Sequence, residues 1–340
     1  MLTTLLFPDT SASVKSLRSL LDELPASASI ALCAHTRPDG DAIGSVAALY
    51  SALVAAGFQP TPLLADNVKV PQIYRWLPQT IKFITPAQLD PRTEFDLFIA
   101  LDVSELVRLG EMKDFCKAAK TRVLIDHHPQ RNPYTELAIV ATDAAATGQL
   151  VWELLPDLGL VRTAEIAMAT YVALVSDTGL FAFSNTDKHA LFDAAAMVEA
   201  GADPALVATH LFGTKPLEAL KLDELVLSRI RLQNGGAVVR SWYSSKDLEH
   251  LKVSSDWTEN LIDLIRVVAG TQVAILLVEG TKGSRVSLRS SGAFDVSAVA
   301  AHFGGGGHHA AAGITWPDAT AHHDDILAAL LPLLPTGSAA

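Results

Sequence analysis

The sequence predicts an α/β fold: a mostly parallel sheet flanked by helices, then a helical connector and a smaller C-terminal α/β domain. Short apolar runs that suit buried strands alternate with helical stretches over roughly the first 185 residues, which is typical of a parallel sheet. The next stretch reads as nearly all helix up to a Gly-Gly pair, and strand-like runs return after that pair. We therefore expect three parts, at residues 1–185, 186–235 and 236–340.

Each element follows from the period of its apolar residues. In the first part we expect a helix at 13–24, a strand at 29–34, an alanine-rich helix at 42–56, and strands at 97–101 and 122–125. In the connector we expect helices at 188–200, 204–212 and 216–233, and no strand. In the last part we expect strands at 237–242, 271–278 and 285–290, with helices between them.

Composition restricts the function classes. The 340 residues include 49% hydrophobic residues and carry a net charge of -11, which disfavours a broad grip on long DNA or RNA and favours small anionic partners. Two cysteines, Cys33 and Cys116, cannot build a disulfide framework and suggest a reducing compartment. Residues 1–25 do not read as a signal peptide, and no apolar run approaches the roughly 20 residues of a membrane span. We therefore expect a cytoplasmic protein without a membrane partner.

The densest chemical signal is the motif HTRPDGDAIGS, which follows the strand at 29–34. It brings His35, Asp39 and Asp41 into seven residues, and Gly40 relieves the backbone so that the two carboxylates can converge. Imidazole and carboxylate ligands suit manganese, iron or zinc, and a carboxylate-rich set shifts the preference towards manganese or magnesium. The alternative is an ordinary Asx turn that caps a helix.

Further acidic and imidazole residues come directly after other apolar segments. Asp126, His127 and His128 end one strand, Asp102 follows another, and Asp177 ends an apolar helical segment. Each alone could be a helix cap, a turn residue or part of a solvated loop. Taken together they stand where a parallel sheet delivers functional groups to one crevice, beyond the carboxyl ends of its strands.

A glycine-rich segment near the C-terminus suggests a second binding element. Gly304, Gly305, Gly306 and Gly307 precede His308. Such glycines let the backbone approach an anion and present amide groups to it, although the segment could also be a flexible loop. Arg285 and Arg289 alternate on one face of the preceding strand, where an arginine fork would match a phosphate.

These motifs together resemble those of the DHH phosphoesterase superfamily. HTRPDGDAIGS, LDVSE, DHH, SDTG, SLRS and FGGGGHHAAAG occur in the family's order over nearly the whole chain. The sequence is similar to the oligoribonuclease and pAp phosphatase (NrnA-type) subgroup, which has a DHH domain followed by a DHH-associated C-terminal domain. The first and last predicted parts would be these two domains.

The resemblance implies a role for each matching residue. One divalent cation would be held by His35, Asp39 and Asp102, and the other by Asp41, Asp102, His127 and Asp177. Asp126 would orient a histidine, and His128 would contact the scissile phosphate. The nucleotide would be held by Arg289, Ser290 and the segment from Gly304 to His308, with Arg285 as our own addition.

The resemblance also implies an activity. We expect hydrolysis of short 5'-phosphorylated oligoribonucleotides to mononucleotides, and of 3'-phosphoadenosine 5'-phosphate to AMP, by water that two divalent cations activate. Manganese is the expected metal, and magnesium, cobalt or iron are compatible with the same ligands. A cyclic dinucleotide phosphodiesterase and a non-catalytic nucleotide-binding regulator are the alternatives. A homodimer rests on analogy alone, and His309, His322 and His323 have no assigned role.

Overall fold

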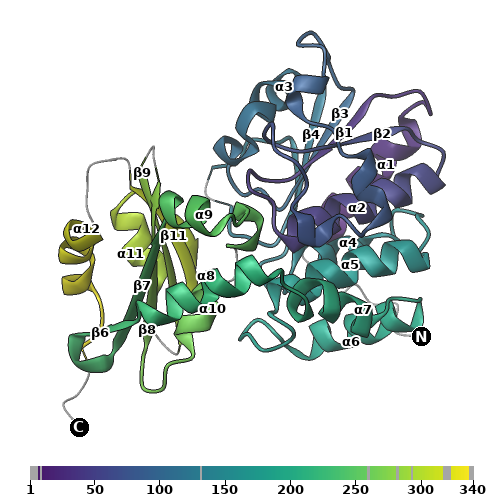
Figure 1. Ribbon diagram of the computed structural model, residues 1–340. Helices are drawn as coiled ribbons and strands as arrows, with labels where there is room; N and C mark the ends of the chain where they lie inside the picture. The colour runs from purple at the N-terminus through teal and green to yellow at the C-terminus, as the bar shows by residue number, and fades with distance from the viewer. Residues whose placement is uncertain are drawn as a thin grey trace. The chain divides into compact units, whose positions relative to one another are not determined.

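Two sheets organise the chain, one in each of two compact units, Met1–Thr214 and Lys215–Ala340 (Figure 1). The structure, a computed structural model, describes residues 7, 10–130, 132–258, 261–280, 283–291, 294–316 and 323–336. The division at residue 214 falls inside the predicted connector, so its helices are shared between the two units. The three-domain division stays a prediction.

The first sheet is parallel throughout and has the strand order β2-β1-β3-β4-β5. Its strands are β1 (Ile30–Cys33), β2 (Pro60–Leu63), β3 (Leu97–Leu101), β4 (Thr121–Asp126) and β5 (Leu137–Val140). The inner strands β1 and β3 are buried along their whole length, as expected where helices cover both faces of a parallel sheet. The predicted parallel α/β fold is therefore confirmed. The edge strand β2 had no strand signal because it contains two prolines, which an edge position tolerates.

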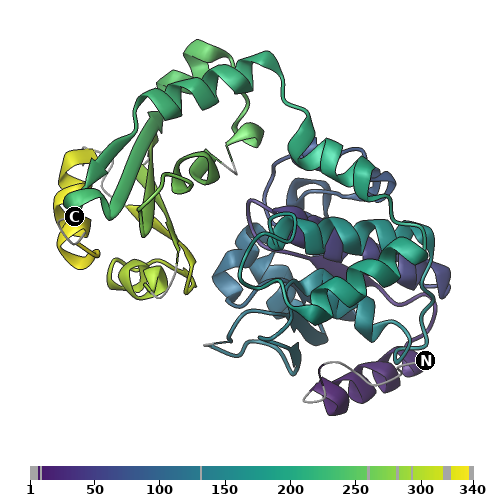
Figure 2. The same cartoon turned by 90° about the horizontal axis from the view of Figure 1, so that it is seen from below.

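Helices cover both faces of this sheet (Figures 1 and 2). On one face, α2 packs against β1 and β3, and it also contacts α4 and α5. On the other face, Cys116 of α3 joins Phe98 and Leu124 of the sheet in one hydrophobic cluster. The helices of this part are α1 (Ser11–Glu23), α2 (Gly40–Ala55), α3 (Lys113–Ala118), α4 (Thr147–Leu154) and α5 (Ala164–Asp177). Short 3₁₀ helices lie at Gln72–Tyr74, Pro78–Lys82, Pro86–Gln88 and Leu106–Met112.

The predicted connector is mostly helical, but its end differs from the prediction. Its helical segments are α6 (Lys188–Glu199), α7 (Pro204–Ala208), a π-helical turn (Thr209–Gly213) and α8 (Leu217–Ser228). The expectation of no strand is wrong, because β6 (Arg231–Gln233) pairs antiparallel with β7 (Val238–Ser244). The turn at Asn234–Gly236 explains this difference: all three of its residues have positive φ, so the chain reverses sharply and lays the preceding residues against β7.

The second sheet is mixed and has the strand order β10-β11-β9-β8-β7-β6. The strand β7 runs parallel to β8 (Val273–Gly280), whereas the other neighbours are antiparallel. The remaining strands are β9 (Gly283–Ser290), β10 (Gly306–His308) and β11 (Ala311–Trp316). The helices are α9 (Ser245–Leu251), α10 (Leu261–Arg266), α11 (Val296–His302) and α12 (His323–Leu330), with 3₁₀ turns at Ser255–Trp257 and Leu331–Leu333.

The glycine segment is not simply a loop, because Gly306–His308 forms a strand of this sheet. The Gly-rich sequence suits this place: a Cβ on Gly305 would lie 2.2 Å from the carbonyl oxygen of Gly313, and one on Gly307 would lie 2.4 Å from that of Ala311. His322 and the side chains of His308 and His323 lie outside the described residues. None of the described helices has both the length and the apolar character that crossing a bilayer requires.

Candidate metal centre

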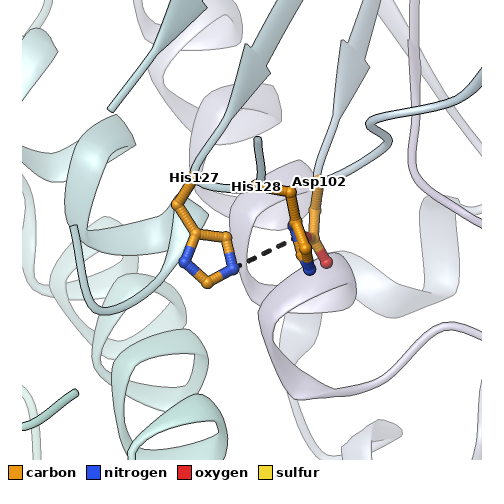
Figure 3. Close-up of side chains that lie close together, drawn as sticks. All are labelled: Asp102, His127 and His128. Carbon is orange, nitrogen blue, oxygen red and sulfur yellow. Dashed lines mark ion pairs between the residues drawn. The ribbon is translucent and has the colours of Figure 1, made fainter. Parts of the chain in front are cut away.

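The candidate ligands gather at one edge of the first sheet because neighbouring strands end there. His35 follows β1, Asp102 follows β3, and His127 and His128 follow β4. Since these strands are parallel neighbours, their carboxyl ends meet, and the side chains beyond them converge. Figure 3 shows Asp102 at the end of its strand, beside His128 and facing His127.

Asp102 occupies a strained backbone position at the centre of this edge. Its φ of 58° lies in the left-handed region, which Asp tolerates better than most residues, and its amide donates to the carbonyl of Ile125. This conformation turns the two carboxylate oxygens towards different neighbours. Oδ2 lies 3.3 Å from Nε2 of His35, whereas Oδ1 lies 3.8 Å from Nε2 of His127. The side chain therefore stands between two groups of ligands.

His35 presents Nε2 to two carboxylates. Its Nδ1 lies 2.8 Å from the carbonyl oxygen of Thr36, and because a carbonyl can only accept, Nδ1 carries the proton that is donated. Nε2 then faces Oδ2 of Asp39 at 3.6 Å and Oδ2 of Asp102 at 3.3 Å. This is the arrangement that a metal-binding imidazole usually has, with its other nitrogen held by a carbonyl.

His127 repeats the arrangement on the other side of Asp102. Its Nδ1 donates to the carbonyl oxygen of Ala144 at 3.1 Å. Its Nε2 lies 3.4 Å from Asp177, 3.7 Å from Asp41 and 3.8 Å from Asp102. Asp177 is the last residue of α5, so a helix end supplies this ligand rather than a strand.

The residues of the HTRPDGDAIGS motif reach the site from the start of α2. Asp39 caps this helix by accepting from the amide of Ala42, so one carboxylate both begins the helix and faces His35. Asp41 lies in the first turn and is fully buried, and it accepts from the amides of Thr147 and Gly148 at 2.7 and 2.8 Å. The positive N-terminal end of α4 thus holds the Asp41 carboxylate in place.

The donor atoms fit a pair of cation sites. Among the described residues they form the groups His35–Asp39–Asp102, Asp41–His127–Asp177 and Asp102–His127–His128, each with its ligand atoms within 4.8 Å of one another. Ligands about 2.0–2.2 Å from one shared cation lie about 3.0–3.5 Å apart. The observed 3.3–3.8 Å separations from the two Nε2 atoms are long for hydrogen bonds but close to this spacing. The residues present therefore fit the binding of divalent cations.

The electrostatics of these groups show why a cation would be favourable there. Burial, together with the charges of Asp102 and Asp177, raises the pKa of Asp41 well above its ordinary value. Burial acts against protonation of His35, but hydrogen bonds to Asp102 and Asp39 outweigh it and raise the pKa of this imidazole to about 10. The crowded carboxylates thus hold a proton on His35, and a divalent cation would replace that positive charge.

Asp126 and His128 form a separate pair beside the ligands. Oδ1 of Asp126 accepts from both the backbone amide and Nδ1 of His128, each at 2.9 Å, while Oδ1 of Asp102 lies 3.2 Å from the same nitrogen. Burial lowers the pKa of His128, but the hydrogen bonds to Asp102 and Asp126 outweigh burial and raise it well above the ordinary value. Asp126 thus holds Nδ1 of His128 by a hydrogen bond, and its role in the site stays a prediction.

The predicted substrate residues lie in the second unit, on β9 and the strand pair β10–β11. Arg285 and Arg289 alternate with the buried Val286 and Leu288, so the two arginines share a face of the sheet as expected. Arg285 also interacts with the hydroxyl of the buried Tyr243, which ties its guanidinium to the protein. Its case as a nucleotide ligand is therefore weaker.

Ser290 and the glycine segment lie close to this arginine pair. The amide of Ser290 donates to the carbonyl of Ala310, and its hydroxyl donates to that of His309 at 3.4 Å. Arg289 pairs in register with Ala311, at the start of β11. Within this unit β11 lies between the glycine strand β10 and the strand β9 that carries the SLRS motif.

Several residues that build the centre had no signal in the sequence. The carbonyls of Thr36 and Ala144 fix the two imidazoles, and the amides of Thr147 and Gly148 fix Asp41. These contacts use backbone atoms, so they leave little trace in the residue types, except that Gly148 has no room for a side chain because a Cβ there would lie 2.2 Å from that of Ala173. The helix start at Thr147 was the one clue that could have been read.

Known proteins resemble the chain along most of its length. Residues 29–175 match the model of the DHH family N-terminal domain, and residues 236–334 match the DHHA1 domain. The bifunctional oligoribonuclease and PAP phosphatase NrnA of Thermus thermophilus is 33% identical over 84% of this chain and 83% of its own. The protein of the same name from Bacillus subtilis is 28% identical over 88% of this chain and 93% of its own.

Solved structures share the fold. An exopolyphosphatase-related protein from Bacteroides fragilis superposes with a TM-score of 0.83 at 21% identity and covers 95% of both chains. RecJ from Thermus thermophilus, solved in complex with Mn²⁺, superposes with a TM-score of 0.56 at 15% identity over 96% of this chain and 55% of its own. With both domain models matched in order and a relative above 30% identity, the chain belongs to the DHH family and carries a DHH N-terminal domain followed by a DHHA1 domain.

Proposed function

We propose that this protein is a metal-dependent phosphoesterase that hydrolyses short 5'-phosphorylated oligoribonucleotides to mononucleotides and 3'-phosphoadenosine 5'-phosphate to AMP. The relatives named as bifunctional oligoribonuclease and PAP phosphatase support this proposal over most of their length. The single observation that carries it here is Asp102, whose two oxygens face two separate groups of candidate ligands. Such a shared carboxylate is what a two-cation hydrolase needs.

The cations would be divided between the two ligand groups. We assign one to His35, Asp39 and Asp102, and the other to Asp41, Asp102, His127 and Asp177. We propose manganese as the metal, since its preference for carboxylate and imidazole ligands matches this set. When bound, two divalent cations supply an activated water and neutralise the charge on the phosphoryl oxygens.

The chain's own residues would position the phosphate. Asp126 accepts from Nδ1 of His128, and despite burial the hydrogen bonds to Asp102 and Asp126 raise the pKa of this ring, so both of its nitrogens carry a proton and Nε2 would donate to a phosphoryl oxygen. A donor held in advance by a buried carboxylate needs little reorganisation as negative charge develops on that oxygen. His128 and Asp126 therefore act as a unit in this proposal.

The second unit would hold the nucleotide. In both proposed substrates the attacked phosphorus is attached to the 3' oxygen of a 5'-phosphorylated nucleoside, so one binding element can serve both. We assign this task to Arg289, Ser290 and the segment Gly304–Gly307 with His308, which β9 and the β10–β11 hairpin bring together. The guanidinium fork of Arg289 suits a terminal phosphate.

Turnover of 5'-phosphorylated diadenosine nucleotide with Mn²⁺ tests the proposal, with Asp102→Asn as the control. We expect AMP from the unaltered protein and about 100-fold less or none from the variant, because an amide cannot share its two atoms between two cations in the same way. Cleavage of a cyclic dinucleotide alone would replace the proposed substrates with the alternative class. Binding of nucleotide without turnover of any of these compounds would indicate a regulator and contradict the proposal.

Two further properties belong to the proposal. Both cysteines are buried free thiols, which supports a cytoplasmic location. A homodimer stays a prediction by analogy, and a measurement of the mass in solution would test it.

A further inference from the structure

The segment from Ala144 to Gly148 contacts three of the six candidate ligands through fixed polar atoms. Its first carbonyl accepts from Nδ1 of His127, and the amides of Thr147 and Gly148 donate to Asp41. The hydroxyl of Thr147 also donates to Oδ1 of Asp102 at 3.3 Å. Three ligands that are far apart in the sequence therefore depend on the position of one five-residue stretch.

A fourth ligand is linked to the same stretch. Nδ2 of Asn185 donates to the carbonyl of Ala145 at 3.0 Å and to the carbonyl of Asp177 at 3.1 Å. The end of α5, which presents Asp177, is thereby tied to the backbone next to Ala144. A displacement of this segment would move ligands from both predicted cation sites.

The segment is itself held by one buried amide side chain. Oε1 of Gln149 accepts from the amide of Ala145 at 2.8 Å, and Nε2 donates to Oδ2 of Asp193 on α6 at 2.7 Å. Gln149 is 1% exposed and Asp193 is 4% exposed, so water does not compete for these bonds. Because Asp193 takes the donor end of the amide, Gln149 must present its acceptor end to Ala145.

We propose that Gln149 is a positioning residue of the metal centre, which fixes the segment 144–148 and so sets the separation of His127 and Asp41. This inference rests on the proposed function, since it assigns Gln149 a role in the binding of the proposed cations. The residue touches no candidate ligand directly, and it acts through the backbone of the segment. Groups that orient metal ligands commonly change metal affinity when they are removed.

The main test is the affinity of metal-free protein for Mn²⁺, measured by titration calorimetry without substrate. Gln149→Met keeps the volume and removes both hydrogen bonds, and we expect the affinity to fall by about 10- to 100-fold. The matched control is Gln79→Met. Gln79 is 2% exposed in the same unit, and its amide bonds to Ser51 and to the carbonyl of Glu165, neither of which touches the centre. We expect this control to retain the Mn²⁺ affinity of the unaltered protein.

A second pair of variants decides the question if Gln149→Met does not fold. Asp193→Asn keeps an oxygen that can accept from Gln149, whereas Asp193→Leu removes it. We expect Asp193→Asn to bind Mn²⁺ like the unaltered protein and Asp193→Leu to bind it about 10-fold more weakly. Equal affinities within this pair would overturn the inference.

The outcomes separate this inference from the proposed function. Unchanged Mn²⁺ affinity in Gln149→Met, or an equal loss in Gln79→Met, would overturn the positioning role even if the unaltered protein releases AMP. Weaker binding in Gln149→Met alone would support the role even if no proposed substrate is hydrolysed. Absence of Mn²⁺ binding by the unaltered protein would overturn it, because there would be no centre to position.

Discussion

The close contact between α2 and α5 allows a quantitative prediction about Gly44. A Cβ at this position would lie 2.4 Å from the carbonyl oxygen of Ala169 and 2.9 Å from the Cβ of Ala173, both closer than real Cβ contacts. Replacement by alanine gains up to about 1 kcal/mol in helix propensity. Overpacking costs about 1–3 kcal/mol, and the upper end applies here because a backbone carbonyl cannot rotate away. We therefore expect Gly44→Ala to lose about 2 kcal/mol in the free energy of unfolding.

This loss can be measured directly. For a unit of this size, about 2 kcal/mol lowers the midpoint of thermal unfolding by about 4–8 °C. Gly213→Ala is the control, since its new Cβ would come no closer than 3.4 Å to its neighbours and make ordinary contacts. Scanning calorimetry of both variants beside the unaltered protein gives the comparison. If Gly44→Ala unfolds at or above the temperature of the unaltered protein, the assumption of rigid packing between α2 and α5 is refuted.

Three further predictions concern charge and metal. Burial, helped by a hydrogen bond to Glu153, raises the pKa of Asp193 to about 8. Between about pH 4 and pH 8 the folded protein therefore keeps a proton on Asp193 that the unfolded protein has lost. The free energy of unfolding should fall over this range by at most about 1.4 kcal/mol per pH unit. Asp193→Asn should flatten this slope in urea unfolding at pH 5, 6.5 and 8, and an unchanged slope would disprove the assignment. Mn²⁺ at about 100 times its dissociation constant should add about 2.7 kcal/mol to the free energy of unfolding, and chelation should abolish this gain. The same Mn²⁺ concentration should stabilise Asp41→Asn by a smaller amount, and an equal stabilisation would argue against Asp41 as a ligand. His128→Asn should lower kcat for the diadenosine nucleotide by about 100-fold while Mn²⁺ binding persists, whereas an unchanged kcat would exclude His128 from phosphate contact.

The sequence indicates the candidate ligands where side chains carry the chemistry, and the structure places these side chains close together. The strand before His35, the glycine at position 40 and the strand before Asp126 each leave a local signal, namely an apolar run followed by polar residues. The parallel sheet follows from the alternation of such runs with helices. The same reasoning could not give the strand order, because nothing in a strand's own residues says that β1 lies between β2 and β3.

Strand pairing also explains where the structure departs from the local sequence signals. Residues 231–233 continue the apolar pattern of α8, and only the turn of positive-φ residues beyond them makes the chain pair with β7. Gly306–His308 has little strand propensity, yet it pairs with the edge of β11 and becomes β10. Glycine suits this pairing because the backbone of β11 comes close to Gly305 and Gly307. In both places a tertiary contact overrides the local preference.

The contacts of segment 144–148 show what a single sequence hides at a functional site. The ligands are recognisable because a carboxylate or an imidazole must stand at each of their positions. The groups that set their geometry are a carbonyl at Ala144 and amides at Thr147 and Gly148, and such backbone groups are common to nearly all residue types. Gly148 alone is restricted further, because a Cβ there would lie 2.2 Å from that of Ala173. Beside the Thr147 hydroxyl, which donates to Asp102, Gln149 is a side chain on this path whose identity matters, because a group with both an acceptor and a donor is needed to join Ala145 to Asp193. A buried amide that touches no ligand can therefore determine the metal affinity of the centre.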